Sequence, residues 1–466
     1  MTDFHNRTFD QIAIGSSESS TRVLSGPEVE ALALVSGDVD PFHLDSSVCQ
    51  IDKGAGFITD AAGLAAMVFG LLNRRLPGPG STILSQNLSF NGQVTRGDQI
   101  SASVIARQKY AHDNSIDFDC RCVNQRGEIL VSGSARVKAP TEQIAYSALA
   151  TPEIILRHTD AFARLLQRCK GQPAVICAVV HPCETSALLG PLAAAREGLI
   201  TPILIGPEAK IRAVAKAAGV DLSPYRIVAV EHSHAAAAKA VAMARAGEVE
   251  ALMKGSLHTD ELMDAVVDAA TGLRSGRRIS HVFVMDVPAY PRMLLITDAA
   301  INIQPTLDEK ADIVRNAIDL AHILGIAQPK VAILSAVETV NPKIASTIDA
   351  SALCKMADRG QISGGILDGP LAFDNAISPE AAKTKNIVSP VAGLADVLVV
   401  PDLEAGNMLA KQLQYLSGAD SAGIVLGARL PIALSSRADS VRMRLASAAV
   451  MALVAHAHRI GAPKKD

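Results

Sequence analysis

Apolar and polar residues follow two different patterns along this chain, and the first pattern ends near residue 138. A segment at 58–76 is rich in Ala, Gly, Leu, Met and Val, which predicts a helix buried on most faces. Segments at 84–90, 100–104 and 116–122 then alternate apolar and polar residues, and 129–137 follows them. Such alternation is typical of antiparallel strands with one buried face. The first pattern therefore predicts an α+β unit in which an antiparallel sheet curls around one long helix.

After residue 150 the pattern changes to short, continuous apolar runs separated by helical segments. The runs lie at 174–180, 202–205, 226–230, 251–253, 279–285, 293–297, 330–334, 365–367, 396–400, 422–426 and 431–434. Continuous apolar strands that alternate with helices favour a mostly parallel sheet with helices on both faces. Because the runs are numerous for one sheet, we expect a three-layer α/β fold with two lobes and a cleft between them. The two patterns predict a first domain at 1–138, a linker at 139–150 and a second domain at 151–466.

Composition narrows the class of protein. Of 466 residues, 49% are apolar and 20% are charged, which excludes a disordered chain. A net charge of −3 and only 3% aromatic residues argue against nucleic-acid binding through basic or stacking surfaces. The chain starts without a signal-peptide pattern, no apolar run approaches the ~18 residues of a membrane span, and the Cys residues form no disulfide framework. We therefore expect a cytoplasmic protein that binds neither nucleic acid nor membrane.

A loop at 36–45 brings a carboxylate and an imidazole together. Asp38 and His43 flank Pro41, and a water held between the two side chains could lose its proton at neutral pH, because His titrates there. The backbone N–H of Ala61, at the start of the buried helix, could stabilise an oxyanion on a thioester carbonyl. Taken alone, the loop favours a surface turn that holds a hydrogen-bonded His.

The wider motif changes this interpretation. The loop reads Ser-Gly-Asp-x-Asp-Pro-x-His-x-Asp, and the small-residue helix, Leu-Pro-Gly-Pro-Gly at 76–80 and Gln-Asn-Leu-Ser-Phe at 86–90 follow in order. Together these elements resemble the MaoC-like (R)-specific enoyl-CoA hydratases over about 10–138. The resemblance implies a hotdog fold, in which Asp38 and His43 activate water for addition to a 2-enoyl-CoA.

Two positions depart from the hydratase pattern. Asp60 and Ala61 stand where the family has His-Gly, whose Gly N–H serves the oxyanion, and Asp40 stands where Asn is usual. The Ala61 N–H can still serve, but a carboxylate beside a forming enolate is unfavourable. The alternative is therefore a hotdog domain kept for CoA binding or oligomerisation without catalysis.

Polar residues stand at the predicted carboxyl ends of strands in the second domain, where ligands gather in α/β folds. The candidate binding residues are Lys254, Ser280, Asp298, Asn302, Asp368, Asp374, Asn407, Ser436 and Arg437. A cleft with Lys, Arg, Ser and Asn side chains suits an anion such as phosphate. Ser280, Asp298 and Asp402 fit helix caps equally well, and the pair Arg277-Arg278 fits an exposed face equally well.

Motifs for bound cofactors are missing from the second domain. No Gly-x-Gly-x-x-Gly follows a strand and no Gly-x4-Gly-Lys-Ser/Thr occurs, so we expect no nucleotide cofactor. His232 and His234 flank Ser233 at the start of an Ala-rich helix, which favours a helix cap over a metal site. The missing nucleotide motif also argues against a metal-dependent decarboxylating dehydrogenase, whose two-lobed α/β fold is broadly similar.

A further set of stretches resembles the phosphate acetyl/butyryl transferase family over about 152–460. The stretches lie at 252–259, 297–302, 368–376, 400–407 and 436–440. The resemblance implies the reaction acyl-CoA + phosphate = acyl phosphate + CoA, with both as substrates and no bound cofactor or metal. It implies that Ser436 and Arg437 hold the phosphate and the acyl oxygen, while a carboxylate deprotonates the CoA thiol.

One departure affects the base and the acyl specificity. The Asp that the acetyl-specific branch carries a few residues beyond Ser-Arg is displaced here to Asp439, and 369–376 resembles the butyryl branch. Acetyl specificity is therefore not assumed. Because both domains would handle acyl thioesters, we predict an enoyl-CoA hydratase fused to a phosphate acyltransferase, and the two resemblances imply a homo-oligomer.

Overall fold

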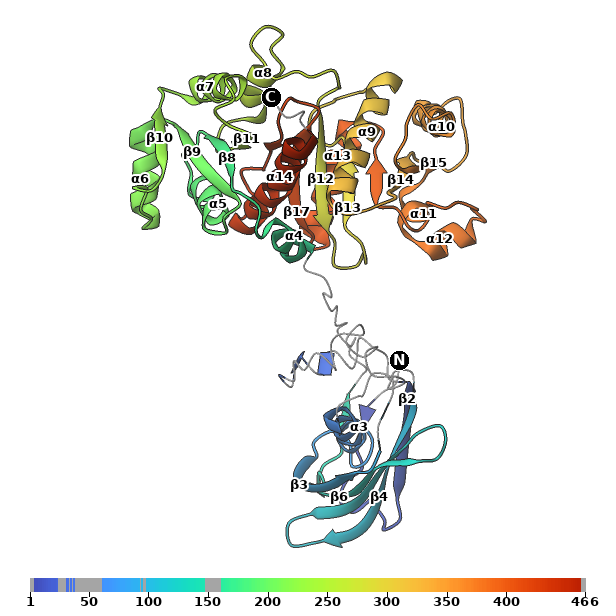
Figure 1. The fold of residues 1–466 in the computed structure, drawn as a ribbon. Helices are drawn as coiled ribbons and strands as arrows, with labels where there is room; N and C mark the ends of the chain where they lie inside the picture. Colours follow the sequence, from blue (N-terminus) through green and yellow to red (C-terminus); the bar gives the residue numbers. More distant parts are fainter. Residues whose placement is uncertain are drawn as a thin grey trace. The chain divides into compact units, whose positions relative to one another are not determined.

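The computed structural model describes residues 4–23, 31–32, 34–35, 37, 61–92, 94, 98–146 and 161–461. Its internal contacts divide the chain into two compact units, Met1–Leu156 and Arg157–Asp466 (Figure 1). No helix within the described ranges is both long enough and apolar enough to cross a membrane.

The first unit is an antiparallel sheet packed on a helix. Its strands, in sheet order, are β2 (Ser17–Val23), β4 (Gln99–Tyr110), β5 (Ser115–Val123), β6 (Ile129–Lys138) and β3 (Thr82–Phe90). The helix, α3 (Ala61–Arg74), contacts all five strands. This arrangement confirms the predicted α+β hotdog fold, in which a long helix lies against a curled sheet.

The alternating pattern predicts the buried face of this sheet well in its centre. Ile100 and Val104 on β4 are fully buried, as are Phe118 and Cys122 on β5. The edge strand β3 differs, because it pairs with β6 alone and its register shifts between Ile83 and Ser85. Its apolar residues are consequently half-exposed rather than buried.

Helix α3 is exposed along one stripe and buried or half-buried elsewhere. Leu64, Val68 and Leu72 are within 2% of full burial, whereas Ala66 and Gly70 are exposed. The described turns of this helix are therefore buried on most faces, as expected, and one stripe is exposed. Small residues all around a helix do not reveal which of its faces meets the sheet.

The segment predicted as a linker begins as part of the first unit. Strand β7 (Ala145–Tyr146) pairs with β1 (Phe4–His5). Asn6 Nδ2 donates to the Glu142 carbonyl oxygen at 2.7 Å, and the Phe9 amide donates to the Pro140 carbonyl at 2.8 Å. These bonds attach 139–146 to the first unit, so the predicted boundary at 138 falls inside a hydrogen-bonded region.

The second unit is built on one continuous eleven-stranded sheet. In sheet order the strands are β10 (Arg226–Ala229), β9 (Ile200–Gly206), β8 (Val175–Val180), β11 (Ala251–Lys254), β18 (Ile432–Ala433), β17 (Asp420–Leu426), β12 (Ser280–Asp286), β13 (Leu294–Thr297), β16 (Val397–Val399), β14 (Lys330–Leu334) and β15 (Ile366–Leu371). Neighbours are parallel in both outer parts, and the three pairs β18–β17, β17–β12 and β12–β13 are antiparallel. The mostly parallel α/β fold is confirmed, with its two halves joined through the central strands β17 and β12 instead of forming separate sheets.

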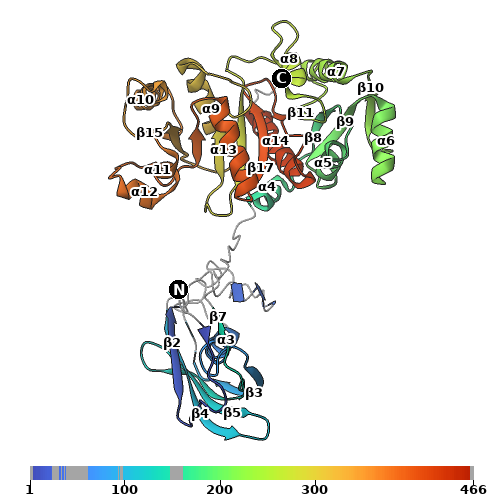
Figure 2. The same ribbon diagram turned by 180° about the vertical axis from the view of Figure 1, so that it is seen from behind.

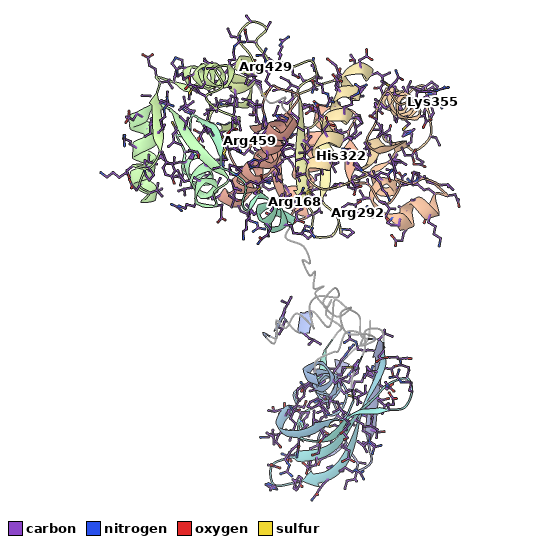
Figure 3. All side chains as sticks on the ribbon, viewed as in Figure 1. Arg168, Arg292, His322, Lys355, Arg429 and Arg459 are labelled. Atoms are coloured by element: carbon purple, nitrogen blue, oxygen red, sulfur yellow. The ribbon has the colours of Figure 1, made fainter. Side chains whose placement is uncertain are left out.

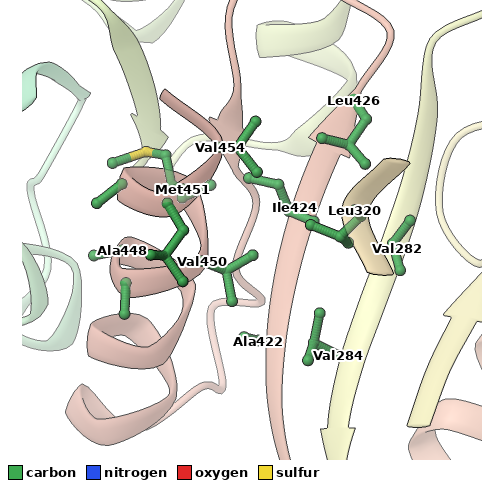
Figure 4. Packing of buried hydrophobic residues seen from close by; sticks show 14 of the residues in the cluster. Val282, Val284, Leu320, Ala422, Ile424, Leu426, Ala448, Val450, Met451 and Val454 are labelled. Carbon is green, nitrogen blue, oxygen red and sulfur yellow. The ribbon is translucent and has the colours of Figure 1, made fainter. Parts of the chain in front are cut away.

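Helices cover both faces of this sheet, as Figures 1 and 2 show from opposite sides. They are α4 (Ala161–Cys169), α5 (Thr185–Arg196), α6 (Glu208–Ala218), α7 (Ser233–Arg245), α8 (Thr259–Val267), α9 (Leu307–Ile323), α10 (Ala345–Asp358), α11 (Phe373–Ile377), α12 (Pro379–Thr384), α13 (Leu403–Leu416) and α14 (Val441–Gly461). The central helix α14 turns Val450 and Val454 toward Ile424 and Leu426 of β17 (Figure 4). Its many Ala residues allow this close approach, which explains how a core with few aromatic residues can still be tightly packed.

Polar contacts fasten α14 to strands far away in sequence. Arg459, which is labelled in Figure 3, forms an ion pair with Glu250 at 2.6 Å and donates to the carbonyl oxygens of Pro173 and Ala174. Glu250 precedes β11, and Ala174 precedes β8. The last helix therefore closes the half of the sheet that carries Lys254.

Candidate active site

The topology separates the predicted site residues into two groups. β11 and β18 are parallel neighbours, so the residues that follow them, Lys254 and Ser436, lie at the same edge of the sheet. Between the two halves of the sheet, β17 runs antiparallel to both of its neighbours, β18 and β12. β13 therefore ends at the opposite end of the central strands, where Asp298 lies beside the first residues of β12. The strand ends of the two halves do not converge at one edge, as the sequence pattern suggested.

The first group, which we call the cationic cluster, consists of Lys254, Arg437 and Arg444. Lys254 ends β11 and is 3% exposed, Arg437 is exposed after β18, and Arg444 is fully buried in α14. Among the described residues, the Lys254 ammonium forms no hydrogen bond or ion pair, and the buried Arg444 Nε has no partner. Burial first, and then the charges of Arg444 and Arg437, lower the pKa of Lys254 to about 8.

Arg444 holds the loop that carries the predicted catalytic residues. Its Nη1 donates to Ser435 Oγ at 2.7 Å, and its Nη2 donates to the Ser436 carbonyl oxygen at 2.8 Å. Asp439 closes the same loop, because its Oδ2 accepts from the Ser436 amide at 2.7 Å and its Oδ1 accepts from Gln414 Nε2 at 3.4 Å. The loop is thus fixed from both sides.

Three helices begin at this edge, because α5, α8 and α14 follow the parallel strands β8, β11 and β18. The first residues of α5 and α8 receive no side-chain cap from Glu184 or His258. Uncapped backbone N–H groups and the positive end of each helix dipole attract anions. The backbone therefore adds to the field of the cationic cluster.

A close approach of two loops completes this edge. Ser256 Oγ donates to the His181 carbonyl oxygen at 2.8 Å and accepts from the Cys183 amide at 3.2 Å. Gly255, which links Lys254 to Ser256, lies so near β8 that a Cβ there would be 2.4 Å from the Val180 carbonyl oxygen. Only glycine fits there, so the sequence Lys-Gly-Ser sets Lys254 at the end of its strand with the next loop folded against β8.

The second group, which we call the aspartate network, consists of Ser280, Asp298, Asn302 and Asn316. Asp298 accepts from the amides of residues 281, 300 and 301 at 2.9–3.2 Å and from Asn302 Nδ2 at 2.5 Å. Asn316 Nδ2 donates to Ser280 Oγ at 2.9 Å. Burial raises the pKa of Asp298, and its hydrogen bonds oppose that shift. The network uses its polar atoms internally. Asp298 caps the bend at residues 300–301, whereas Ser280 is the first residue of β12 and caps no helix, so the helix-cap alternative is wrong for Ser280.

The remaining predicted residues are scattered. Asn407 Nδ2 donates to the Ala299 carbonyl oxygen at 3.1 Å and so joins the aspartate network. Asp368 accepts from the amide of the next residue at 2.8 Å, and Asp374 is ion-paired with Lys385 at 3.0 Å on an exposed surface. These contacts bring neither Asp368 nor Asp374 into either group.

In the first unit, the predicted hydratase residues can be placed only in part. Ala61 is the first residue of α3, whose first turn carries no acidic residue. Asp38 and His43 lie outside the described residues. Their arrangement stays a prediction from the motif.

Comparisons with known proteins agree with the geometry of the second unit. The family model for phosphate acetyl/butaryl transferase matches residues 229–452. A phosphate acetyltransferase from Rhizobium meliloti is 64% identical over 298 residues, which cover 64% of this chain and 94% of that protein. The chain belongs to the phosphate acetyl/butyryl transferase family. A phosphate butyryltransferase from Clostridium acetobutylicum is also similar, at 39% identity over 63% of this chain and 98% of that protein.

Solved structures give the same result for the fold of this family member. The crystal structure of a branched-chain phosphotransacylase from Enterococcus faecalis V583 is 29% identical, covers 60% of this chain and 99% of that chain, and has a TM-score of 0.53. The (R)-hydratase PhaJ1 from Pseudomonas aeruginosa is 26% identical and covers 33% of this chain and 99% of that chain. Its TM-score of 0.32 assigns no activity to the first unit.

The transferase unit also contains site residues that the sequence did not reveal. Arg444 of α14 bonds the Ser436 carbonyl, and Gln414 of α13 bonds Asp439 in the same loop. Each is one of several polar residues in a long helix, so the sequence does not single it out. A sequence signal is the pair Arg442-x-Arg444 near the start of an Ala-rich helix. Such a charge usually faces solvent, so its burial depends on the tertiary fold.

Proposed function

We propose that the second unit transfers an acyl group between CoA and phosphate, acyl-CoA + phosphate = acyl phosphate + CoA, at the cationic cluster. The observation that carries the proposal is Lys254, a residue only 3% exposed whose ammonium has no protein partner among the described residues, beside Arg437 and Arg444. Leaving a buried cation unpaired lowers stability, so the arrangement is favourable when an anion binds. The family membership supports phosphate as that anion.

Each residue has a role that follows from its position. Arg437 is exposed and unconstrained, and its planar guanidinium can bind two phosphate oxygens at once. The Ser436 hydroxyl can donate to the acyl oxygen as negative charge develops there. Arg444 holds the Ser436 carbonyl and therefore positions the loop without touching substrate. The substrates supply all the reacting atoms, so the proposal includes no bound cofactor or metal.

The reaction begins when a phosphate oxygen attacks the thioester carbonyl carbon. The carbonyl oxygen gains negative charge in the tetrahedral intermediate, and the positive edge formed by the cations and the helix N-termini stabilises it. The C–S bond then breaks, and CoA leaves as a thiolate that takes up a proton. In the opposite direction the thiolate is the nucleophile.

An acyl-CoA panel with phosphate tests this proposal. We expect acetyl-, propionyl- or butyryl-CoA to release free thiol only when phosphate is present, and the preferred chain length assigns the acyl class. Thiol release is followed with a colorimetric thiol reagent. The control variant Arg359→Ala removes an exposed arginine far in sequence from the cluster and should leave the rate unchanged. A wild-type protein without phosphate-dependent release on any of these thioesters would contradict the proposal.

For the first unit, we propose hydration of 2-enoyl-CoA by Asp38 and His43, with the Ala61 N–H at the oxyanion. The hotdog arrangement of the sheet around α3 and the position of Ala61 as the first residue of that helix support it. Loss of crotonyl-CoA absorbance is measured for the wild type and for His43→Ala. Equal, negligible rates would favour the alternative, a non-catalytic module for CoA binding or for assembly of the homo-oligomer, which light scattering on the full chain measures.

A further inference from the structure

We propose that Lys254 is the proton shuttle of the transferase reaction, acting on the sulfur of CoA in place of a carboxylate. The proposal rests on the transferase activity proposed above. It departs from the expectation that an acidic residue near Ser436-Arg437 serves as the base.

The carboxylate nearest the predicted position is already engaged. Asp439 is 6% exposed, and its two oxygens accept from the Ser436 amide and from Gln414. Taking up a proton on Oδ2 would break the bond that closes the Ser436 loop. Asp439 therefore stabilises the loop through hydrogen bonds and is not free to exchange protons.

Lys254 is free for that exchange. The residue is 3% exposed at the end of β11, and its ammonium forms no hydrogen bond or ion pair with the residues that the structure describes. The charged groups that act on it are Arg444 and Arg437, which disfavour its ammonium form, and Asp439 and Glu184, which favour it. The two arginines keep their own protons, so Lys254 is the member of the cationic cluster that can give one up.

The pKa of Lys254 supports the same role. Burial and the two arginines bring this pKa to about 8, close to the ordinary thiol pKa of about 8.5. Proton transfer is most effective when the pKa of the acid or base lies near the working pH. Both protonation states are then populated near neutrality, as a shuttle requires.

The proposed step balances in protons and charge. In acyl phosphate formation, a phosphate oxygen attacks the carbonyl carbon, the C–S bond breaks, and the Lys254 ammonium donates its proton to the leaving thiolate. The P–OH group of the new acyl phosphate then returns a proton to the neutral amine. In the opposite direction, the amine takes the thiol proton, the thiolate attacks the acyl carbon, and phosphate leaves with the proton from Lys254.

Two substitutions separate proton transfer from charge in the full-length protein. Lys254→Arg keeps a positive charge but cannot release a proton, and Lys254→Ala removes both. We expect both variants to lose about 10²-fold or more in kcat for acyl-CoA plus phosphate. We expect KM for phosphate to stay within about 3-fold of wild type in Lys254→Arg. The exposed Lys239 on α7 provides the control Lys239→Ala, which should retain full activity.

The pH profile and chemical rescue decide the assignment. In the direction from acyl-CoA, the wild-type rate should fall as pH rises through about 8, because the ammonium form is lost. This alkaline limb should be absent from Lys254→Ala, and added methylamine should restore part of its rate. The alkaline limb should persist in Glu184→Gln. This variant removes an exposed carboxylate that acts on Lys254 but keeps the lysine itself.

The outcomes distinguish the two proposals from each other. Lys254→Arg with wild-type kcat, or an alkaline limb that survives in Lys254→Ala, would show that Lys254 acts only through its charge and would overturn the shuttle. Loss of the limb together with amine rescue would support it. Failure of the transferase proposal is visible separately, because the wild type itself would then release no thiol with phosphate.

Discussion

Two groups of polar residues stand at strand ends of the same sheet, and they differ in whether the protein uses their hydrogen-bonding capacity itself. In the cationic cluster, Lys254 has no partner among the described residues and Arg444 keeps a buried Nε unpaired. In the aspartate network, both carboxylate oxygens of Asp298 accept hydrogen bonds from the surrounding backbone and from Asn302. A saturated buried network stabilises a fold, whereas an unpaired buried cation destabilises it until an anion binds. Residue type alone therefore does not separate a ligand site from a structural network, but the partners of each side chain do.

Removing Arg437 should have the largest effect on activity and almost none on stability. Arg437→Ala should lower phosphate-dependent CoA release by about 10²–10³-fold or more, because a charge-assisted contact to the reacting phosphate is lost. The side chain is exposed, so the free energy of unfolding should change by no more than about 0.5 kcal/mol. Thiol release and a thermal melt measure the two quantities. Crotonyl-CoA hydration, if present, should be unaffected, and retention of both activities would place the phosphate elsewhere.

Removing Asp298 should have the reverse effect. Asp298→Ala leaves several buried N–H donors without an acceptor, and each costs about 1–3 kcal/mol. We expect a loss of about 3 kcal/mol or more, seen as a lower midpoint in urea followed by far-UV circular dichroism. Asp374→Ala is the matched control, because that carboxylate is an exposed partner of Lys385. If Asp298→Ala were as stable as this control but inactive, Asp298 would belong to the ligand site after all.

The sequence predicts the two folds and the strand-end positions, but not which strand ends meet. Lys254 and Ser436 are 182 residues apart in the chain, and they lie at one edge because β18, only two residues long, pairs with β11. So short a strand carries little pattern of its own. Asp298 is predicted to bind ligand because it follows a strand, but Asp caps loops and binds ligands with the same oxygens. Only the hydrogen bonds of the fold distinguish the two uses, and only the packing of α14 explains why Arg444 is buried.

Arg444 offers a way to sharpen the comparison, because it is buried in the cationic cluster yet bonded like a member of a structural network. Arg444→Met removes the bonds to Ser435 Oγ and the Ser436 carbonyl but also removes an unpaired buried Nε. We expect kcat to fall about 10-fold through a looser loop, with stability changed by about 1 kcal/mol or less. Removing a positive charge near Lys254 should also raise its pKa, so the alkaline limb of the pH–rate profile should move to higher pH. A limb that stays in place would show that Arg444 does not act on Lys254.

His281 connects the two groups and gives the smallest expected effect. Its amide donates to Asp298, and its fully buried ring lies near the backbone of Leu434, just before the Ser436 loop. Burial lowers the pKa of His281 to about 3 against 6.5 in the unfolded chain, and the Leu434 backbone opposes only part of that shift. Below pH 6.5 the unfolded state binds a proton that the folded state does not. The free energy of unfolding should therefore be unaffected by His281 above pH 6.5. Between pH 6.5 and pH 3 it should fall by about 1.4 kcal/mol per pH unit.

Urea unfolding of the full chain at pH 7.5 and pH 5.5 measures this dependence. His281→Leu removes the buried imidazole, so its stability should fall less between the two pH values than that of wild type, by about 1 kcal/mol. The exposed His234→Ala should behave like wild type, because its side chain is 72% exposed in the folded protein. Equal pH dependence in wild type and His281→Leu would mean that the imidazole already takes up its proton in the folded state.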